Sequence, residues 1–309
     1  MKKTFLLLTI AFLAASIDLS AHETDGPVET AAVETYEQHY DFRDFTALSV
    51  ANAFHVDFAF ADDWSVDISV PDFIEPYLKV NCSGDKVRIG LNKLPVDIQR
   101  KLSKTSDALH ATVRMPKLLS LSLSGAVHMT AEGSQELEGE PMSIEMSGAS
   151  KLESLVTSGD GILHMELSGA SKAGLQADFK QMKIGVSGAS KLTLAGHADK
   201  VDVDCSGASV CQFTGDYQSL RSEISGSSRM DISGDVRTVV IDCSGSSKAE
   251  IDGVVEKAEV ELSGVSKATL SVKERLDYEL SGVSTLRFRD LGASVRGEIS
   301  RGSKIEYMK

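Results

Sequence analysis

A short motif, an apolar residue followed by Ser-Gly, recurs along most of the chain at a nearly constant interval. Between Gly188 and Gly264 each motif glycine follows the previous one by 19 residues. A fixed period of about this length is typical of solenoids, in which one repeat cannot bury its apolar face alone. The motif glycines from the first clear repeat onward are Gly148, Gly169, Gly188, Gly207, Gly226, Gly245, Gly264 and Gly282, with Gly125 preceding them and Arg301 in a degenerate last copy.

Apolar and polar residues alternate on both sides of each Ser-Gly corner. Val201-Asp-Val-Asp-Cys205 precedes Gly207, and Cys211-Gln-Phe213 follows it. A period of two is that of a β-strand, and glycine at a corner permits a positive φ or a close backbone approach. A second glycine recurs between the strands, at positions 196, 215, 234 and 253. We therefore predict an all-β fold: a parallel β-helix of about nine coils, each with two short strands and two turns, over residues 116–309.

Two columns of apolar residues should line the interior of the stacked coils. One lies two residues before the motif glycine and the other six residues after it. The first reads Met146, Leu167, Val186, Cys205, Ile224, Cys243, Leu262, Leu280 and Ile299. The second reads Leu175, Leu194, Phe213, Ile232, Ile251, Leu270 and Phe288.

The N-terminal part of the chain divides into three predicted segments. Residues 1–21 have the basic start, short apolar run and small residue of a secretory signal peptide, with Ala21 at the expected cleavage site. Residues 22–39 are acidic and are predicted to be a linker. Residues 40–115 alternate as strands do and are predicted to cap the solenoid, with one helical turn at 71–77 and a polar loop at 92–108. We expect an exported protein in the periplasm, at the cell surface or outside the cell, with no transmembrane segment in the mature chain.

Residues 45–50, 80–89 and 116–125, leading into serial Ser-Gly-Ala-Ser-Lys copies, resemble one known family. It is the putative auto-transporter adhesin head GIN domain family (DUF2807), and the resemblance covers about residues 40–309. The resemblance implies a β-solenoid with a role at the cell surface in adhesion. It supplies no catalytic residues.

Two rows of charge flank the Ser-Gly corner. Acidic residues lie three positions before the glycine in most coils, from Glu145 and Glu166 to Glu298. Basic residues lie three positions after it, and these are the candidate binding residues: Lys151, Lys172, Lys191, Arg229, Lys248 and Lys267. One interpretation is a solubilising surface in which the two rows offset each other. The other is a periodic charged and hydroxyl face for an anionic glycan or an envelope protein.

The other polar features have structural interpretations. The serines on either side of each glycine fit turn chemistry. The four cysteines are expected to be free and buried, because Cys205 and Cys243 stand two coils, about 9–10 Å, apart. The seven histidines are scattered and no Cys-x-x-Cys occurs, so neither a metal nor a cofactor is expected.

Three functions remain open on the sequence. The first is a non-enzymatic surface-binding module for glycan or protein. The second is an assembly module that self-associates through its coil edges. The third is a β-helix carbohydrate-active enzyme, for which paired acids such as Glu153 with Asp160, or Asp216 with Asp235, would be needed. Nucleic acid is not an expected partner, because the net charge is −13 and no basic block occurs.

Overall fold

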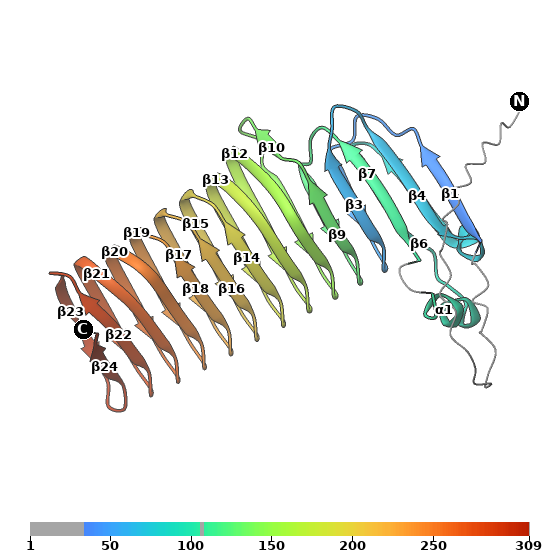
Figure 1. Ribbon diagram of the computed structural model, residues 1–309. Helices are drawn as coiled ribbons and strands as arrows, with labels where there is room; N and C mark the ends of the chain where they lie inside the picture. The colour runs from blue at the N-terminus through green and yellow to red at the C-terminus, as the bar shows by residue number, and fades with distance from the viewer. Residues whose placement is uncertain (1–33, 106–107, 309) are drawn as a thin grey trace, which may run out of the picture. The chain divides into compact units, whose positions relative to one another are not determined.

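The computed structural model describes residues 34–105 and 108–308. The predicted signal peptide and residues 22–33 of the predicted linker lie outside this range. From Glu34 onward the chain forms one compact unit. This unit is a β-solenoid of about ten turns, in which successive coils follow one another along one axis (Figure 1). The predicted fold class is confirmed.

Each coil contributes a strand to each of two ladders, which we call face A and face B. Face A runs through the strands that precede the Ser-Gly corners. Nearly all adjacent strands of this ladder pair in parallel without a register shift. In order along the axis it contains β6 (Lys86–Leu91), β2 (Ala47–Val50), β8 (Ser120–Leu123), β11 (Met142–Met146), the second halves of β12 (Lys151–Leu167) and β13 (Lys172–Val186), β15 (Ala198–Cys205), β17 (Tyr217–Ile224), β19 (Val236–Cys243), the second halves of β20 (Lys248–Leu262) and β21 (Lys267–Leu280), and β23 (Ser294–Ile299).

Face B runs through the strands that follow the corners. In order it contains β4 (Ser65–Pro71), β7 (His110–Met115), β3 (His55–Phe60), β9 (His128–Glu132), the first halves of β12 and β13, β14 (Lys191–Ala195), β16 (Val210–Thr214), β18 (Arg229–Ser233), the first halves of β20 and β21, β22 (Thr285–Asp290) and β24 (Lys304–Tyr307). The long strands β12, β13, β20 and β21 continue through the second corner, where β10 (Gln135–Leu137) pairs with β12.

The motif glycines stack on one another at the Ser-Gly corner. Gly188 has a φ of 74°, and the amide of Ala189 donates to the carbonyl of Gly169 at 2.7 Å. A Cβ at position 188 would lie 2.4 Å from that same carbonyl oxygen. Glycine is therefore required here both by its left-handed backbone and by the contact between coils. Asn52, with φ 74°, takes this place in the β2–β3 coil, where Ala126 donates to its carbonyl.

The predicted interior columns are buried. Every member of the column six residues after the glycine is at most 6% exposed, and so are Met146 to Leu280 in the column before it. Ile299 is the exception, at 48% exposed, on β23. Stacked apolar side chains of successive coils thus form one continuous core.

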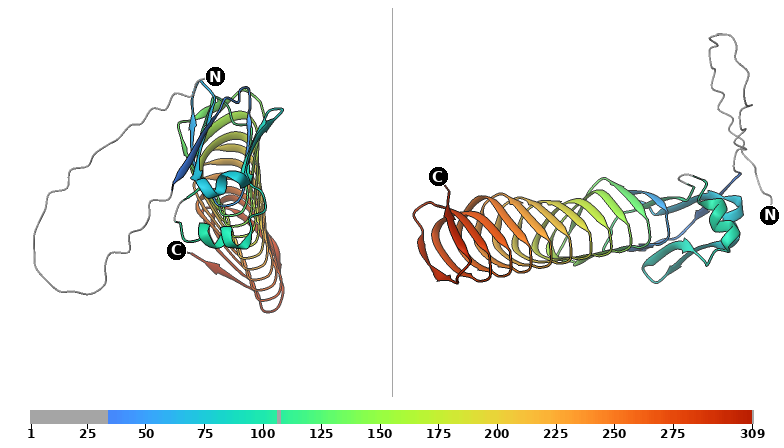
Figure 2. Two further views of the ribbon diagram at one scale, coloured as in Figure 1. Left: turned by 90° about the vertical axis from the view of Figure 1, so that its right-hand side faces the viewer. Right: turned by 90° about the horizontal axis from the view of Figure 1, so that it is seen from below.

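The N-terminal strands belong to the same two ladders. The β2–β3 coil lies between the β6–β7 coil and the β8–β9 coil, because β2 pairs with both β6 and β8 and β3 with both β7 and β9. Antiparallel pairs appear only beyond this point among the described strands, where β1 (Thr35–Tyr40) joins β4, β4 joins β7, and β5 (Leu78–Ser83) joins β6. The short helices η1 (Asp72–Tyr77) and α1 (Val96–Leu102) lie at this end of the stack (Figure 2).

Two local predictions in this region were wrong. The linker was expected to extend to residue 39, but Thr35–Tyr40 pairs with β4 along its whole length, because the alternation of its side chains suits an edge strand. The polar loop expected at 92–108 contains α1, which begins directly after Pro95. Proline before the first turn favours such a start, and the helix is too short to show an apolar stripe.

The prediction of four free cysteines was also wrong. Cys205 and Cys211 form a disulfide, with a Cα–Cα distance of 7.2 Å. The prediction compared equivalent positions in different coils, whereas these two residues face each other inside one coil, on either side of the Gly207 corner. Cys243 is free and buried, and Cys82 is free and half-buried.

Candidate functional site

The candidate basic residues stack as one row on the outer side of face B. Lys151 pairs with Lys172, Lys172 with Lys191, and Arg229 with Lys248, which in turn pairs with Lys267. Val210 separates Lys191 from Arg229. Neighbouring strands in such a ladder lie about 4.8 Å apart, so the row presents cations at a regular spacing along the axis.

The acidic row occupies the outer side of face A, not the surface beside the lysines. Glu166, Gly185 and Asp204 are successive neighbours in this row. We expected the charges of the two rows to offset each other. Among residues 34–105 and 108–308, however, no salt bridge joins the acidic row to the basic row. Each face instead pairs its own charges. On face B, Lys151 Nζ lies 2.8 Å from Glu153 Oε1, and Arg229 Nε lies 2.7 Å from Asp231 Oδ2.

These pairs hold the acids of face B in their charged form. The hydrogen bond from Lys151, followed by that from His128, lowers the pKa of Glu153. The ammonium of Lys248 likewise lowers the pKa of Glu250. Where an acid stands two residues after the basic residue, the cation is therefore locally neutralised.

Lys267 has a threonine in place of such an acid, but it is half-buried and pairs only with Lys248 and Thr285 in the ladder. One stretch of face B has exposed lysines on adjacent strands without such acids. Along the outer side of β14, β16 and the Lys172–Gln176 part of β13 the chain places only cationic, amide, hydroxyl, small or aliphatic residues. Lys172 and Lys191 are exposed and form no salt bridge within the described part of the chain. We call this surface the face B window. It comprises Lys172, Gly174, Gln176, Lys191, Thr193, Ala195, Val210, Gln212 and Thr214.

The serines beside the glycines serve the corner, as predicted. Ser171 Oγ donates to the carbonyl of Ser168 at 2.8 Å, and Ser209 Oγ donates to that of Ser206 at 2.6 Å. The serines two residues after each glycine are at most 2% exposed from Ser150 to Ser284. They do not form an outward hydroxyl surface, so the hydroxyls available within residues 172–176, 191–195 and 210–214 of face B are those of the threonines.

Of the acid pairs considered for catalysis, Asp216 and Asp235 do lie in neighbouring coils, but each carboxylate accepts a backbone N–H. Glu153 and Asp160 have separate partners. Glu153 bonds to Lys151 and His128, while Asp160 lies 3.6 Å from Lys180. Asp216 Oδ1 accepts the amide N–H of Asp235, and Asp235 Oδ1 accepts that of Val254, each at 2.8 Å. These two aspartates thus cap the second corner of the following coil.

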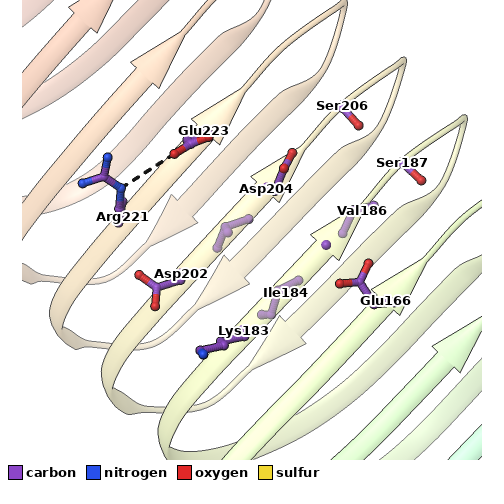
Figure 3. Close-up of a pocket in the computed structure, with 12 residues that line it drawn as sticks. Glu166, Lys183, Ile184, Val186, Ser187, Asp202, Asp204, Ser206, Arg221 and Glu223 are labelled. Carbon is purple, nitrogen blue, oxygen red and sulfur yellow. Dashed lines mark ion pairs between the residues drawn. The ribbon is translucent and has the colours of Figure 1, made fainter.

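Face A carries a shallow depression where Gly185 interrupts the acidic row (Figure 3). Its volume is about 410 Å³. Lys183 and Arg221 line it together with four carboxylates, and Arg221 Nε lies 3.8 Å from Glu223. The carboxylate of Glu166 covers the glycine, since a Cβ at 185 would lie 2.3 Å from its Oε2. Acids outnumber cations here, which makes the depression unsuited to an anionic ligand. The four acids are Glu166, Asp202, Asp204 and Glu223.

Sequence reasoning missed three histidines that continue the basic row. His110, His55 and His128 occupy the same register as Lys151 on face B. The rings of His55 and His110 are 5.6 Å apart between centroids, and those of His55 and His128 are 5.2 Å apart. The signal in the sequence is weak, because the β2–β3 coil is separated in the chain from the coil it joins. Only His128, three residues after Gly125, shares the spacing of the lysines.

No group of histidine, cysteine or acidic residues in the described ranges is placed to hold a metal ion. Nor does any helix of residues 34–105 and 108–308 have the length and apolar character to cross a membrane.

Comparisons with known proteins identify one family and several similar solved structures. The family model described as "Putative auto-transporter adhesin, head GIN domain" (DUF2807) matches residues 44–215 and 210–289. Among solved structures, a putative adhesin from Parabacteroides distasonis is 13% identical, with a TM-score of 0.48, covering 90% of this chain and 98% of that one. A putative adhesin from Parabacteroides merdae is also 13% identical, with a TM-score of 0.45, 89% of this chain and 97% of that one being covered.

A protein titled putative lipid binding protein, also from Parabacteroides distasonis, is 12% identical, with a TM-score of 0.39 and coverage of 89% and 97%. No curated protein matches the chain.

Proposed function

Because the chain belongs to the family of putative auto-transporter adhesin head GIN domains, we propose that its solenoid is a non-enzymatic adhesin module. It binds an extended anionic glycan along face B. The observation that carries this proposal is the face B window, where Lys172 and Lys191 stand exposed on adjacent strands without the acid that follows Lys151, Arg229 and Lys248 two residues later. The same surface offers amides and hydroxyls from Gln176, Thr193 and Gln212.

The chemistry of the window favours a charged polysaccharide over a neutral one. Its outer positions contain no aromatic ring on which a sugar could stack. Attraction must therefore come from charge and hydrogen bonds. The chain as a whole carries −13, but screening limits the reach of the distant acids to about 8 Å at physiological salt.

The window is a poor match for a protein partner. Interface centres are rich in aromatic and large apolar anchors. The strongly exposed large apolar side chains of the described residues lie elsewhere, at Val96, Val265, Val283, Leu291, Ile299 and Tyr307. A repeated row of cations, in contrast, suits a polymer with repeated anions. Export to the periplasm or cell surface, expected from residues 1–21, would bring the module to such polymers.

Calorimetric titration with dextran sulfate tests this function, with neutral dextran as the matched probe. We expect the wild-type protein to bind dextran sulfate and not dextran. The variant K172Q/K191Q should bind roughly 2- to 30-fold more weakly, since an exposed ion pair contributes about 0.2–1 kcal/mol. The control K248Q should have a smaller effect, because Lys248 already pairs with Glu250 at 2.5 Å.

Two results would contradict the glycan proposal. One is the absence of any dextran sulfate binding, and the other is an equal loss in K172Q/K191Q and K248Q. If an envelope protein is captured by the wild type and lost from K172Q/K191Q while dextran sulfate does not bind, the ligand of the window is a protein.

The assembly alternative has one observation in its favour. Within the described residues β23 and β24 pair only with β21 and β22, and Tyr307 on β24 is 71% exposed. An open strand edge can template pairing with a second copy. Light scattering across a wide range of protein concentrations tests this alternative. A molar mass that rises with concentration supports assembly, and a constant monomer mass contradicts it.

A further inference from the structure

The three histidines lie at one end of the basic row, on the same face as the window. From β7 through β3 and β9 to β12, β13 and β14, the successive residues in this register are His110, His55, His128, Lys151, Lys172 and Lys191. Six consecutive coils thus carry either an imidazole or an ammonium at the same outer position. The side chain of His128 retains 32% exposure, and His110 is exposed.

We propose that His110, His55 and His128 extend the glycan-binding row when they are protonated, so that the protein binds an anionic polysaccharide more tightly in mildly acidic surroundings. This inference rests on the proposed function, and it adds both a second part of the site and its control by pH. Imidazole is the side chain whose charge ordinarily changes between about pH 5 and 8.

Acids surround the histidines and determine what protonation does. Three acids lie on the same face one outward position further along the strands. They are Asp67 of β4, Asp57 of β3 and Glu153 of β12. Glu153 Oε2 lies 2.6 Å from His128 Nε2. With neutral imidazoles, this end of face B is therefore predominantly acidic and repels a polyanion.

The remaining charged groups that face the imidazoles are of both signs. A depression of about 470 Å³ brings His110 together with Glu37 and His39 of β1 and with Asp67. Arg114 of β7 and Glu132 of β9 lie on the outer side of their strands, and Lys151 of β12 follows His128 in the row. Protonation of three imidazoles offsets these acids.

The row then presents cations beyond the window. A polyanion already seated on Lys172 and Lys191 can reach past Lys151 along the same face. The spacing of the ring centroids, 5.2 and 5.6 Å, is close to the strand spacing of about 4.8 Å that separates the lysines. The anions of one extended chain can therefore meet imidazolium and ammonium groups in a single line.

Titration of the wild-type protein with dextran sulfate at pH 7.5 and pH 5.5 tests the inference, because sulfate esters remain charged at both values. We expect the affinity to be at least about threefold higher at pH 5.5, because each protonated imidazole adds an ion pair of the strength that exposed pairs have. Proton uptake on binding at pH 6.5, from calorimetry in two buffers of different ionisation enthalpy, should be positive. This second readout requires no variant.

The variant H55Q/H110Q/H128Q should lose the gain, so that its own affinity no longer rises between pH 7.5 and pH 5.5. The control H164Q removes a histidine on the outer side of face A and should keep the gain. Wild-type affinity that is equal at the two pH values, a gain that survives in the triple variant, or an absence of proton uptake would overturn the inference while leaving the proposed function intact. A wild-type protein that binds dextran sulfate at neither pH contradicts the proposed function itself.

Discussion

At the scale of single residues, the corner glycine combines two constraints that a sequence pattern alone cannot separate. Gly188 needs a positive φ, and it also lies against the carbonyl of Gly169. Gly139 has a φ of 78° with nothing within 4 Å of an added Cβ. The two positions therefore distinguish backbone strain from contact between coils.

We expect Gly188→Ala to lower the free energy of unfolding by more than Gly139→Ala does. The left-handed conformation costs an alanine about 1–2 kcal/mol at either site. At position 188 the 2.4 Å contact adds a further cost, because the stacked backbone cannot move away without breaking the ladder. Chemical denaturation of both variants measures the difference. Equal losses of unfolding free energy in the two variants would show that the contact between Gly188 and Gly169 does not contribute to stability.

The cysteines give a second test at this scale. Burial raises the pKa of the Cys243 thiol to about 12, so it should resist alkylation at pH 8 in the folded protein. After unfolding without reductant, mass spectrometry should find label on Cys82 and Cys243 and none on Cys205 or Cys211. Removing the disulfide with C205A/C211A should cost about 2 kcal/mol on the loop-entropy estimate. Labelling of all four cysteines without reductant would contradict the pairing.

At the scale of elements, strand β1 shows how an acidic segment joins the sheet. His39 Nδ1 of β1 lies 2.6 Å from Asp67 Oδ1 of β4, and His39 also bonds to Asp41. The hydrogen bonds to Asp67 and then Asp41 raise the pKa of His39. A raised folded-state pKa contributes stability that is fully present below the unfolded value of about 6.5 and is lost as pH rises through the folded-state value.

The pairing of β1 with β4 should therefore loosen between about pH 6 and 8.5. Hydrogen exchange of the amides of β1, corrected for intrinsic rates, should show weaker protection at the higher pH, while β14 stays unchanged. The variant H39Q should abolish this dependence. Equal protection of β1 at both values in the wild type would show that the ion pair does not hold the strand.

The elements also show where sequence reasoning succeeds and where it fails. The 19-residue period gives the register of β13 to β20 directly, so Lys172 and Lys191 could be aligned from the sequence. The β2–β3 coil has Asn52 in place of the corner glycine and lies between coils that follow it in the chain. The repeat period does not predict this spatial order of coils. The position of His55 and His110 in the same row as Lys151 therefore became visible only in the structure.

At the scale of the whole described unit, the proposed function depends on the separation of two rows of charge between two faces. Parallel stacking places each residue of a coil above the equivalent residue of the next coil. A charge type that recurs at one position of the repeat therefore forms a row of like charges along the axis. The acidic row of face A and the basic row of face B arise in this way. The window arises because three successive coils omit the acid two residues after the basic position, at Gly174, Thr193 and Gln212.

The most direct test of this account is lysine footprinting by acetylation and mass spectrometry, with and without dextran sulfate. If the polyanion lies along face B, Lys172 and Lys191 should be protected, while Lys183 and Lys200 on face A should react as in the free protein. Protection of the face A lysines, or a bound state in which Lys172 and Lys191 react freely, would contradict it.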